Sequence, residues 1–411
     1  MQLRASIPYR AYWSTPFARW QGAFAHLHSL RFAAHVARAE FARRKFDPGM
    51  IELGVLGMTR PERNGFYGLP WLMGLAGAGQ VAGPTVSQAC ATSMRALSVV
   101  AREVSTGEAN VAIAIACDRT SNGPHIYYPN PAGMGGTGEA EDFILENMAC
   151  DPLGGHAMIQ TAENVARRFG IDTARQHELV LRREAQYRDA LAHNRRFQKG
   201  YMTIPFPVPD SRLRKIQTSL DGDEGVRFST AEGLAALKPV TEGGTVTFGG
   251  QTHPADGSAA IIVTSPERAR EITADAAVSI EILGFGQSRA ELAYMPEAPI
   301  AAAERALAFA GVSVRELAAI NTHNPFIVND LAFAQATGAD PDTMNARGCS
   351  LVYGHPNAPT GLRSTIELIE QLVERGGGLG LFTGCAAGDS AMAVVIRVDA
   401  SRRRAGLSRS E

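Results

Sequence analysis

The stretch GPTVSQACATSMRAL, residues 83–97, joins a short strand-like run to the beginning of a helical pattern, with Cys90 at the junction. The turn TGEAN follows the helical pattern, and the apolar run VAIAIA then leads to Cys117. This order predicts a strand–helix–strand unit. Four apolar residues recur at the spacing of one helix face, namely Met94, Leu97, Ala101 and Val104.

A second unit of the same order lies near the C-terminus. The run CSLVYGHP precedes a helical pattern, the turn ERGGG, and the apolar run LGLFT, which ends at Gly384-Cys385. Cys90 and Cys117 are 27 residues apart, and His355 and Cys385 are 30 residues apart. Apolar runs that alternate with helices are typical of parallel strands covered by helices. We therefore predict a duplicated α/β architecture, with chance similarity of two such units as the alternative. The helix face of the second unit holds Ile366, Leu368, Ile369 and Leu372.

The region between the two units has a different character, with a glycine-rich piece, AGMGGTGEAEDF, and two helical stretches. The second stretch begins at Asp172 or Thr173, because Thr173 and Gln176 have the spacing of a capping box. Ser313 and Glu316 have the same spacing. The run IIVTS resembles a strand that returns to the first half. We predict a first half over residues 1–123, completed by a strand near 251–270. An inserted domain over 124–250 and a second half over 271–411 complete the chain.

The composition excludes several classes of protein. The formal net charge of −1 over 411 residues gives no electrostatic case for nucleic-acid binding. No apolar run approaches the roughly 18 residues that a membrane span needs, and the N-terminus lacks a secretory signal. The five cysteines show no paired metal-ligand spacing. We expect a cytoplasmic enzyme without a metal site, whose basic end at Arg402, Arg403 and Arg404 is solvated.

Cys90 is the strongest candidate nucleophile. A cysteine at the first turn of a helix faces unpaired amides and the positive end of the helix dipole, which lower the thiol pKa. A strand-to-helix elbow also presents its side chain to a ligand. The alternative is a buried structural cysteine. Cys117, Cys150 and Cys349 lack this setting, so we expect them to be core or near-core thiols.

Three further positions could assist Cys90. His355, in GHPNAPTG, occupies the corresponding elbow of the second unit, and a duplicated fold brings matching elbows together. Cys385 ends a strand and precedes small residues, a setting that suits a second acid/base thiol beside an oxyanion hole. His323 and Asn324 follow the apolar run LAAI, so they lie at the carboxyl end of a strand. Packing roles remain the alternative for both histidines and for Asn324.

At this point the chain resembles the thiolases, from STPFARWQGAF to AMAVVIRV. Seven segments occur in thiolase order: VSQACATSMRAL, TAENVARRFGID, LAALKPV, GGTVTFGG, ADGSAA, GHPNAPTG and GCAAGDS. The resemblance implies an α/β thiolase fold. It consists of two similar five-stranded βαβαβαββ halves in a five-layer arrangement, with an inserted loop domain that covers the substrate site.

The resemblance also assigns roles to single residues. Cys90 matches the acylated nucleophile, His355 the histidine that activates it, and Cys385 the thiol that moves the proton alpha to the thioester. The NEAF motif of the family reads HNPF here, which resembles the HDCF form of the sterol-carrier-protein thiolases. His323, supported by Asn324, is therefore assigned to the oxyanion hole of the thioester oxygen.

Two other segments depart from the family pattern. The CxG motif after the second thiol reads CAA, so Ala387 would supply the oxyanion amide that acts beside the amide of Cys90. The GNASG segment reads GGQTH, so Thr252 takes the place of the serine that touches coenzyme A, with Gly250 nearby.

The implied activity is thiolytic cleavage, or the reverse Claisen condensation, of a 3-oxoacyl-CoA through an acyl-cysteine. Coenzyme A is a substrate, and no permanently bound cofactor is expected. The nearest subtype acts on branched or aromatic acyl groups, such as 2-benzoylsuccinyl-CoA. Alternatives are a biosynthetic acetyl-CoA acetyltransferase, a decarboxylating ketoacyl synthase, against which Cys385 counts, and a non-catalytic acyl-CoA-binding scaffold. The aromatics of HIYYPNPAG and PWLMG either line an acyl pocket or pack in the core.

We also expect partners. Thiolase-like chains pair through the first half, so a homo-oligomer is predicted, with VAIAIA as the interface strand. Thiolases of the unusual sort are often accompanied by a small zinc-ribbon/OB-fold subunit, for which HIYYPNPAG would be the docking patch. An autonomous homo-oligomer is the alternative.

Overall fold

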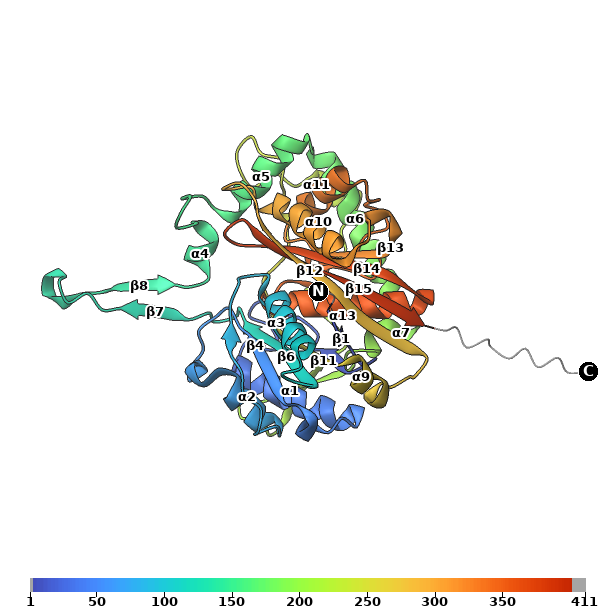
Figure 1. Ribbon diagram of the computed structural model, residues 1–411. Coiled ribbons are helices and arrows are strands. Elements are labelled where there is room, and N and C mark those ends of the chain that lie inside the picture. The colour runs from blue at the N-terminus through green and yellow to red at the C-terminus, as the bar shows by residue number, and fades with distance from the viewer. Residues whose placement is uncertain (1–2, 401–411) are drawn as a thin grey trace, which may run out of the picture.

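Helices and strands alternate in five layers in the computed structural model, which describes residues 3–400 (Figure 1). Two outer helices cover one sheet, two central helices separate the sheets, and two more helices lie outside the second sheet. This arrangement confirms the predicted five-layer α/β architecture. The outer pair on the first sheet is α1 (Ser29–Arg44) and α2 (Gly68–Ala76). The central pair is α3 (Thr92–Thr106) and α13 (Thr360–Arg375), and the pair outside the second sheet is α10 (Ala298–Ala310) and α11 (Ile327–Thr337).

The first half contains the strand that was predicted to return from beyond the intervening region. This strand, β11, pairs antiparallel with β6, and β6 pairs in parallel with β4. Both β11 and β6 are buried almost throughout, as expected of strands covered on both faces. The strands of this half are β2 (Tyr12–Ser14), β3 (Ala18–Arg19), β4 (Leu53–Gly57), β5 (Thr85–Val86), β6 (Val111–Arg119) and β11 (Ala255–Thr264).

The run VAIAIA cannot be the interface strand that the sequence suggested, because β6 is flanked by β4 on one side and β11 on the other. Its backbone groups are therefore already paired. The edge of this half is β5, whose only strand partner in the described chain is β4.

The second half follows the order β13-β14-β15-β12, and β1 (Ala5–Ser6) pairs with both β12 and β11 to join the two halves. Within residues 3–400 this half has no counterpart of β5, because the run CSLVYGHP forms helix α12 (Ser350–Tyr353) instead of a strand. An apolar run of this length does not distinguish a strand from a helical turn. The strands are β12 (Val278–Arg289), β13 (Leu317–His323), β14 (Gly377–Ala386) and β15 (Ser390–Ala400).

The central helices α3 and α13 determine where the two elbows meet. The predicted apolar face of α3 is buried, and α13 is buried from Thr360 through Leu372, since both sheets pack on it. Near their N-termini, Ser93 Oγ accepts a hydrogen bond from the amide of Leu362 at 3.1 Å. A Cβ on Gly361 would lie 2.9 Å from Ser93 Oγ, so glycine permits this close approach. The residues just before both helices therefore face each other.

Part of the intervening segment packs on the second half, and part of it projects outward. Its hairpin of β7 and β8 projects from the body of the molecule, whereas α5 and α6 pack on α11 (Figure 1). The elements of the segment and the helix that follows it are β7 (His125–Tyr128), β8 (Glu139–Asp142), α4 (Leu145–Ala149), α5 (Met158–Phe169), α6 (Thr173–Ala190), α7 (Ala192–Lys199), β9 (Phe206–Pro209), β10 (Ile216–Leu220), α8 (Ala231–Ala235) and α9 (Pro266–Ile272). The domain limits predicted from the sequence stay a prediction.

The two predicted helix starts had different outcomes. Asp172 caps α6, because its Oδ1 accepts a hydrogen bond from the amide of Arg175 at 2.8 Å, so the capping box predicted at Thr173 is wrong. Ser313 and Glu316 do form the reciprocal capping box, at a single 3₁₀ turn before β13.

Several smaller expectations are also settled. Cys117 and Cys349 are buried, but Cys150 is exposed where α4 ends, so its placement near the core was wrong. In PWLMG, Leu72 and Met73 pack in the outer core with α1. The basic positions Arg402, Arg403 and Arg404 lie outside the described residues. Among residues 3–400 there is no helix with the length and apolar character of a membrane span.

Candidate active site

Cys90 lies on a tight elbow between β5 and α3, as predicted. Ala89, just before it, has φ 43°, a left-handed conformation that alanine rarely adopts. The side chain of Thr92 holds this turn, since its Oγ1 donates to the carbonyl of Ala89 at 2.6 Å and accepts from the amide of Gln88 at 2.7 Å. The elbow is thus fixed by local hydrogen bonds that offset its backbone strain.

Cys90, His323 and His355 meet at the end of the central layer. Their donor atoms lie within 4.8 Å of one another, and the two imidazole centroids are 4.0 Å apart. His323 ends β13, whose parallel pairing with β14 sets it opposite Gly384 and so beside Cys385. Within residues 3–400 this is also the one group of donors that could converge on a metal ion, and its thiol and imidazoles suit zinc.

A hydroxyl orients each imidazole. His355 Nδ1 is 2.7 Å from Thr360 Oγ1, and His323 Nδ1 is 2.7 Å from Ser350 Oγ. The Nε2 atom of each ring is buried and has no hydrogen-bond partner in the described chain. A buried polar atom without a partner is costly, which suggests that substrate atoms satisfy both nitrogens.

Burial keeps both histidines neutral. It lowers the pKa of His323 to about 3. It also lowers the pKa of His355 well below its usual value, and the neighbouring His323 and Arg60 act in the same direction. At neutral pH each ring therefore has one nitrogen with a free lone pair, so His355 is able to accept a proton from a thiol.

Burial favours the protonated form of both thiols. Burial raises the pKa of Cys90 to about 11, and the amide of Ala387 and the Arg60 guanidinium counter only part of that effect. The pKa depression predicted from the helix start is therefore wrong for this state. Burial, and next the nearby Cys90, also raises the pKa of Cys385, whose sulfur accepts a hydrogen bond from Asn329 Nδ2 at 3.2 Å. Deprotonation of Cys90 consequently needs a base.

Asn324 supports the site from behind. Its Nδ2 donates to Asp330 at 2.7 Å, and its Oδ1 accepts from the amide of Leu351 at 3.2 Å. These bonds occupy the side chain and hold the turn that carries His323. The amide of Ala387 reaches the Cys90 sulfur from the turn after β14, the place where the CAA motif predicted an oxyanion donor.

Two cavities flank the catalytic cluster. One, of about 730 Å³, is lined by Thr252, His253 and Pro254, the last of which forms a backbone bridge with His355. The other, of about 300 Å³, is lined by Ala89 and Ala387 on either side of Cys90 and by apolar residues of the intervening segment. Those apolar residues are Phe143, Ile144, Met148, Pro152 and Met158.

The two residues predicted to touch coenzyme A differ in position. Thr252 lines the larger cavity, but its hydroxyl already donates to the carbonyl of Ser350. Gly250 is buried, and a Cβ there would lie 3.2 Å from Ile327 of α11. Gly250 therefore serves packing and does not line the cavity.

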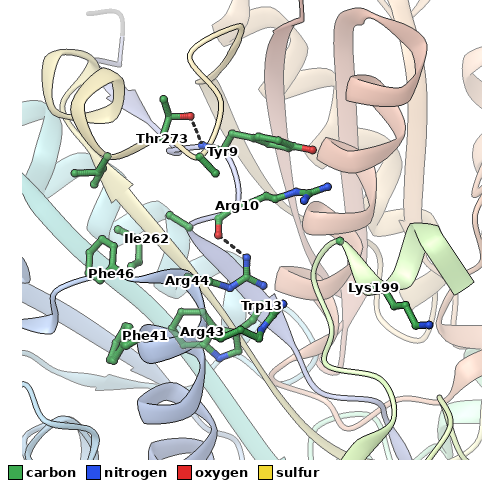
Figure 2. A pocket seen from close by; sticks show the side chains of 14 residues that line it. Tyr9, Arg10, Trp13, Phe41, Arg43, Arg44, Phe46, Lys199, Ile262 and Thr273 are labelled. Carbon is green, nitrogen blue, oxygen red and sulfur yellow. Dashed lines mark hydrogen bonds between the residues drawn. The ribbon is translucent and has the colours of Figure 1, made fainter.

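A further cavity, of about 380 Å³, lies away from this cluster (Figure 2). It includes Ile262, which is seven residues along β11 from Ala255, the neighbour of His355, and thus roughly 23 Å distant. Arg43 and Arg44 contribute charge to it, but both pair with Glu40, at 2.7 and 2.9 Å. We assign no chemistry to it.

Comparison with known proteins agrees with this site. The family model "Thiolase, N-terminal domain" matches residues 11–267, and "Thiolase, C-terminal domain" matches residues 276–398. The chain belongs to the thiolase family. It is therefore an acyltransferase of that family. An acetyl-CoA acetyltransferase of Paracoccus denitrificans is 27% identical over 394 residues, covering 93% of this chain and 96% of the relative. A 3-ketoacyl-CoA thiolase of Vibrio cholerae is 29% identical over 429 residues, covering 94% and 95%.

Solved thiolase structures have the same fold. Human mitochondrial 3-ketoacyl-CoA thiolase in complex with CoA superimposes with a TM-score of 0.87 at 23% identity, covering 97% of this chain and 100% of that chain. The acetyl-CoA acetyltransferase of Bacillus anthracis also gives a TM-score of 0.87, at 24% identity, covering 97% and 99%. The predicted thiolase fold is confirmed.

Sequence reasoning missed several residues of this thiolase site. Thr360 and Ser350 orient the histidines, and Asn329 contacts Cys385. Arg60 and Asn357 border the smaller cavity. A signal existed for Arg60, since it follows the apolar run LGVLG and thus lies beyond the carboxyl end of a strand, like His323.

Proposed function

We propose that this thiolase cleaves a 3-oxoacyl-CoA with coenzyme A, or forms it in the reverse Claisen direction, through an acyl group on Cys90. The observation that carries the proposal is the meeting of the Cys90 thiol with two neutral, half-satisfied imidazoles, beside a second thiol at Cys385. A nucleophile, a base and a second proton donor are the groups that carbon–carbon cleavage beside a thioester needs.

The proposed reaction follows from these positions. His355 accepts the proton of Cys90, and the thiolate attacks the 3-oxo carbon, whose oxyanion is held by the amides of Cys90 and Ala387. The C2–C3 bond then breaks. His323 Nε2 donates a hydrogen bond to the oxygen of the leaving enolate, and the enolate carbon takes a proton from Cys385. The protonated thioester fragment then leaves. The thiol of coenzyme A gives its proton to Cys385 and attacks the acyl-cysteine, which releases a shortened acyl-CoA, and the departing Cys90 recovers its proton from His355.

Coenzyme A would occupy the larger cavity. Besides Thr252, the cavity is lined by Arg19 and Arg227, which can pair with phosphates, and by the exposed aromatic rings of Trp20 and Phe248. Human mitochondrial 3-ketoacyl-CoA thiolase, which has this fold, was crystallised with CoA, which supports coenzyme A as a ligand. No permanently bound cofactor is proposed.

The smaller cavity favours an acyl group larger than acetyl. Its volume of about 300 Å³ and its Phe143, Ile144 and Met148 lining suit a branched or aromatic acyl chain, such as the benzoyl group of 2-benzoylsuccinyl-CoA. A biosynthetic acetyl-CoA acetyltransferase, the activity that names the Paracoccus relative, is the second candidate. A thiolysis assay with 3-oxohexanoyl-CoA, acetoacetyl-CoA and 2-benzoylsuccinyl-CoA separates these possibilities. Failure to form any product thioester or acyl-Cys90 would contradict the proposed function.

The role of His323 gives a sharper prediction. If its Nε2 holds the enolate oxygen, His323→Ala should slow carbon–carbon cleavage by about 100-fold or more, because one oxyanion donor is lost. Acyl transfer from a simple thioester to Cys90 forms no enolate and should change much less. Stopped-flow measurement of both half-reactions checks this prediction, and equal losses in the two would point to a packing role.

We further propose that the protein is at least a homodimer, paired along the free edge of β5. The edge is bordered by Phe66 and Tyr67, which are 97% and 67% exposed, unusual for such large apolar side chains in a free monomer. Light scattering at micromolar concentration should give a dimer or larger species. Phe66→Asp should shift it toward monomer, while a monomeric wild type would contradict the proposal.

A companion subunit belongs to the same proposal. The tyrosines of HIYYPNPAG lie on the projecting hairpin, where Tyr127 and Tyr128 are 59% and 51% exposed. They line none of the cavities described above, so their exposure favours a docking patch, and a small zinc-ribbon/OB-fold protein remains the proposed occupant. Full activity of the chain purified alone would exclude a required companion.

A further inference from the structure

Arg60 is a buried arginine that, unlike two other buried arginines of this chain, forms no ion pair with a carboxylate within residues 3–400. Arg183 and Arg363, which are also buried, pair with carboxylates, Arg183 with Asp330 at 2.9 Å and Arg363 with Asp223 at 2.5 Å. Arg60 is 7% exposed, and no carboxylate within residues 3–400 forms an ion pair with its guanidinium. Guanidinium stays charged in proteins, and a buried charge without a counterion is strongly destabilising. The positive charge of Arg60 is therefore only partly compensated, by carboxylates that do not contact the guanidinium.

The hydrogen bonds of Arg60 leave part of its donor set free. Its Nη1 donates to Thr59 Oγ1 at 3.2 Å, and its Nη2 donates to Asn357 Oδ1 at 3.1 Å. Its Nε is buried and has no partner in the described chain. Arg60 lines the cavity of about 300 Å³ beside Cys90. The side-chain amide of Asn357 links the guanidinium to the nucleophile, because its Oδ1 accepts from Arg60 and its Nδ2 lies 3.9 Å from the Cys90 sulfur.

The carboxylates around Arg60 are committed elsewhere. Asp118 accepts from the amides of Thr59 and Ala358 at 2.9 Å each, and its partial neutralisation of Arg60 acts over a longer distance. Asp256 Oδ1 accepts from the amides of Thr120 and Ser121 at 2.7 and 2.8 Å. Asp151 also lines the cavity, and its Oδ1 accepts from the amides of Leu153 and Gly154 at 2.8 Å. An anion in the cavity would therefore bind at the Arg60 side, away from Asp151.

We propose that Arg60 selects 3-oxoacyl-CoA substrates whose acyl portion carries a carboxylate. The guanidinium offers this carboxylate its free donors, Nε among them, while the apolar wall of Phe143, Ile144 and Met148 contacts the carbon skeleton. This inference rests on the proposed thiolase function and names the substrate class for the same site. The bound carboxylate would form the direct ion pair that Arg60 does not make within residues 3–400.

Matched pairs of substrates test the proposal. The first pair is 3-oxoadipyl-CoA and 3-oxohexanoyl-CoA, and the second is 2-benzoylsuccinyl-CoA and 2-benzoylbutanoyl-CoA. The members of each pair differ only in a carboxylate that replaces a methyl group. Wild-type enzyme should favour the carboxylated member of at least one pair by about 10- to 100-fold in kcat/KM. Arg60→Met should abolish that preference, and Arg60→Lys should retain part of it.

The ratio within a pair is the decisive quantity, because Arg60 also acts on Cys90 and its loss should slow every substrate. Arg227→Met, in the larger cavity, should slow both members alike and leave the ratio unchanged. Cleavage of 3-oxohexanoyl-CoA with no preference in either wild-type pair would overturn this inference but leave the proposed function standing. A preference that survives in Arg60→Met would also overturn it. If Arg60→Met does not fold, the wild-type ratios and Arg60→Lys decide. Failure to cleave any of the four compounds or acetoacetyl-CoA, with no acyl group formed on Cys90, would refute the proposed function itself.

Discussion

Cys90→Ala should fold like the wild type and lose thiolysis by about 10⁴-fold or more, because the thiol that carries the acyl group in the proposed mechanism is lost. The substitution removes one sulfur atom beside a cavity, and it leaves the Thr92 hydrogen bonds that hold the elbow. Its effect on stability should therefore be small, about 1 kcal/mol. Steady-state thiolysis and thermal melting measure the two quantities.

A matched cysteine provides the control. Cys150 is exposed at the end of α4, and Cys150→Ala should keep wild-type activity. Active wild type quenched with a 3-oxoacyl-CoA should show, by mass spectrometry, an acyl group on the peptide that contains Cys90. An acyl group found instead on Cys385 or another cysteine would overturn the assignment of the nucleophile.

The loss of His355 should have the next largest effect, and that effect should depend on pH. With the pKa of Cys90 near 11, only about 10⁻⁴ of the thiol is ionised at pH 7, so acylation relies on transfer of the proton to His355. His355→Gln should therefore slow acylation by about 100- to 10,000-fold at pH 7. The variant should recover about tenfold for each pH unit, because the thiolate fraction rises tenfold per unit below the pKa.

Single-turnover acylation measured from pH 7 to 9.5 checks this behaviour. The wild-type rate should change little in this range, since burial keeps the base neutral throughout. His26→Gln, a change at an exposed histidine that bonds to Pro209, should match the wild type. A His355→Gln rate that is independent of pH would show that His355 is not the base for Cys90.

The sequence predicted the elements with long, regular patterns. The face of α3 at Met94 and Leu97 and the strands β6 and β11 were recovered, because apolar periodicity and length together specify them. The five-layer order followed from the resemblance to the thiolases and not from these patterns. The short run CSLVYGHP, which contains His355, was wrongly predicted to begin with a strand, because a few apolar residues fit a helical turn as well as a strand. The position of VAIAIA inside the sheet depends on β11, which is distant in sequence, and local pattern carries no such information.

The sequence predicted the site residues whose side chains are chemically reactive, the cysteines and histidines. Cys90, His355, Cys385 and His323 were found from their elbows and strand ends, and the structure brings them together. Their ionisation was not predictable, because burial outweighs the helix start at Cys90 and becomes known only from packing. Arg60 was missed because an arginine after a strand usually faces solvent, and its lack of a counterion is visible only in three dimensions.

The place of β11 in the chain sets the order in which the protein can mature during synthesis. The strand β6 ends at residue 119, but the neighbour that covers its open edge spans residues 255–264. A nascent chain thus presents an unpaired apolar strand until that segment leaves the ribosome, a state prone to aggregation. His355 emerges later still. The growing polypeptide therefore exposes this strand edge well before it contains His355, the base of the proposed mechanism.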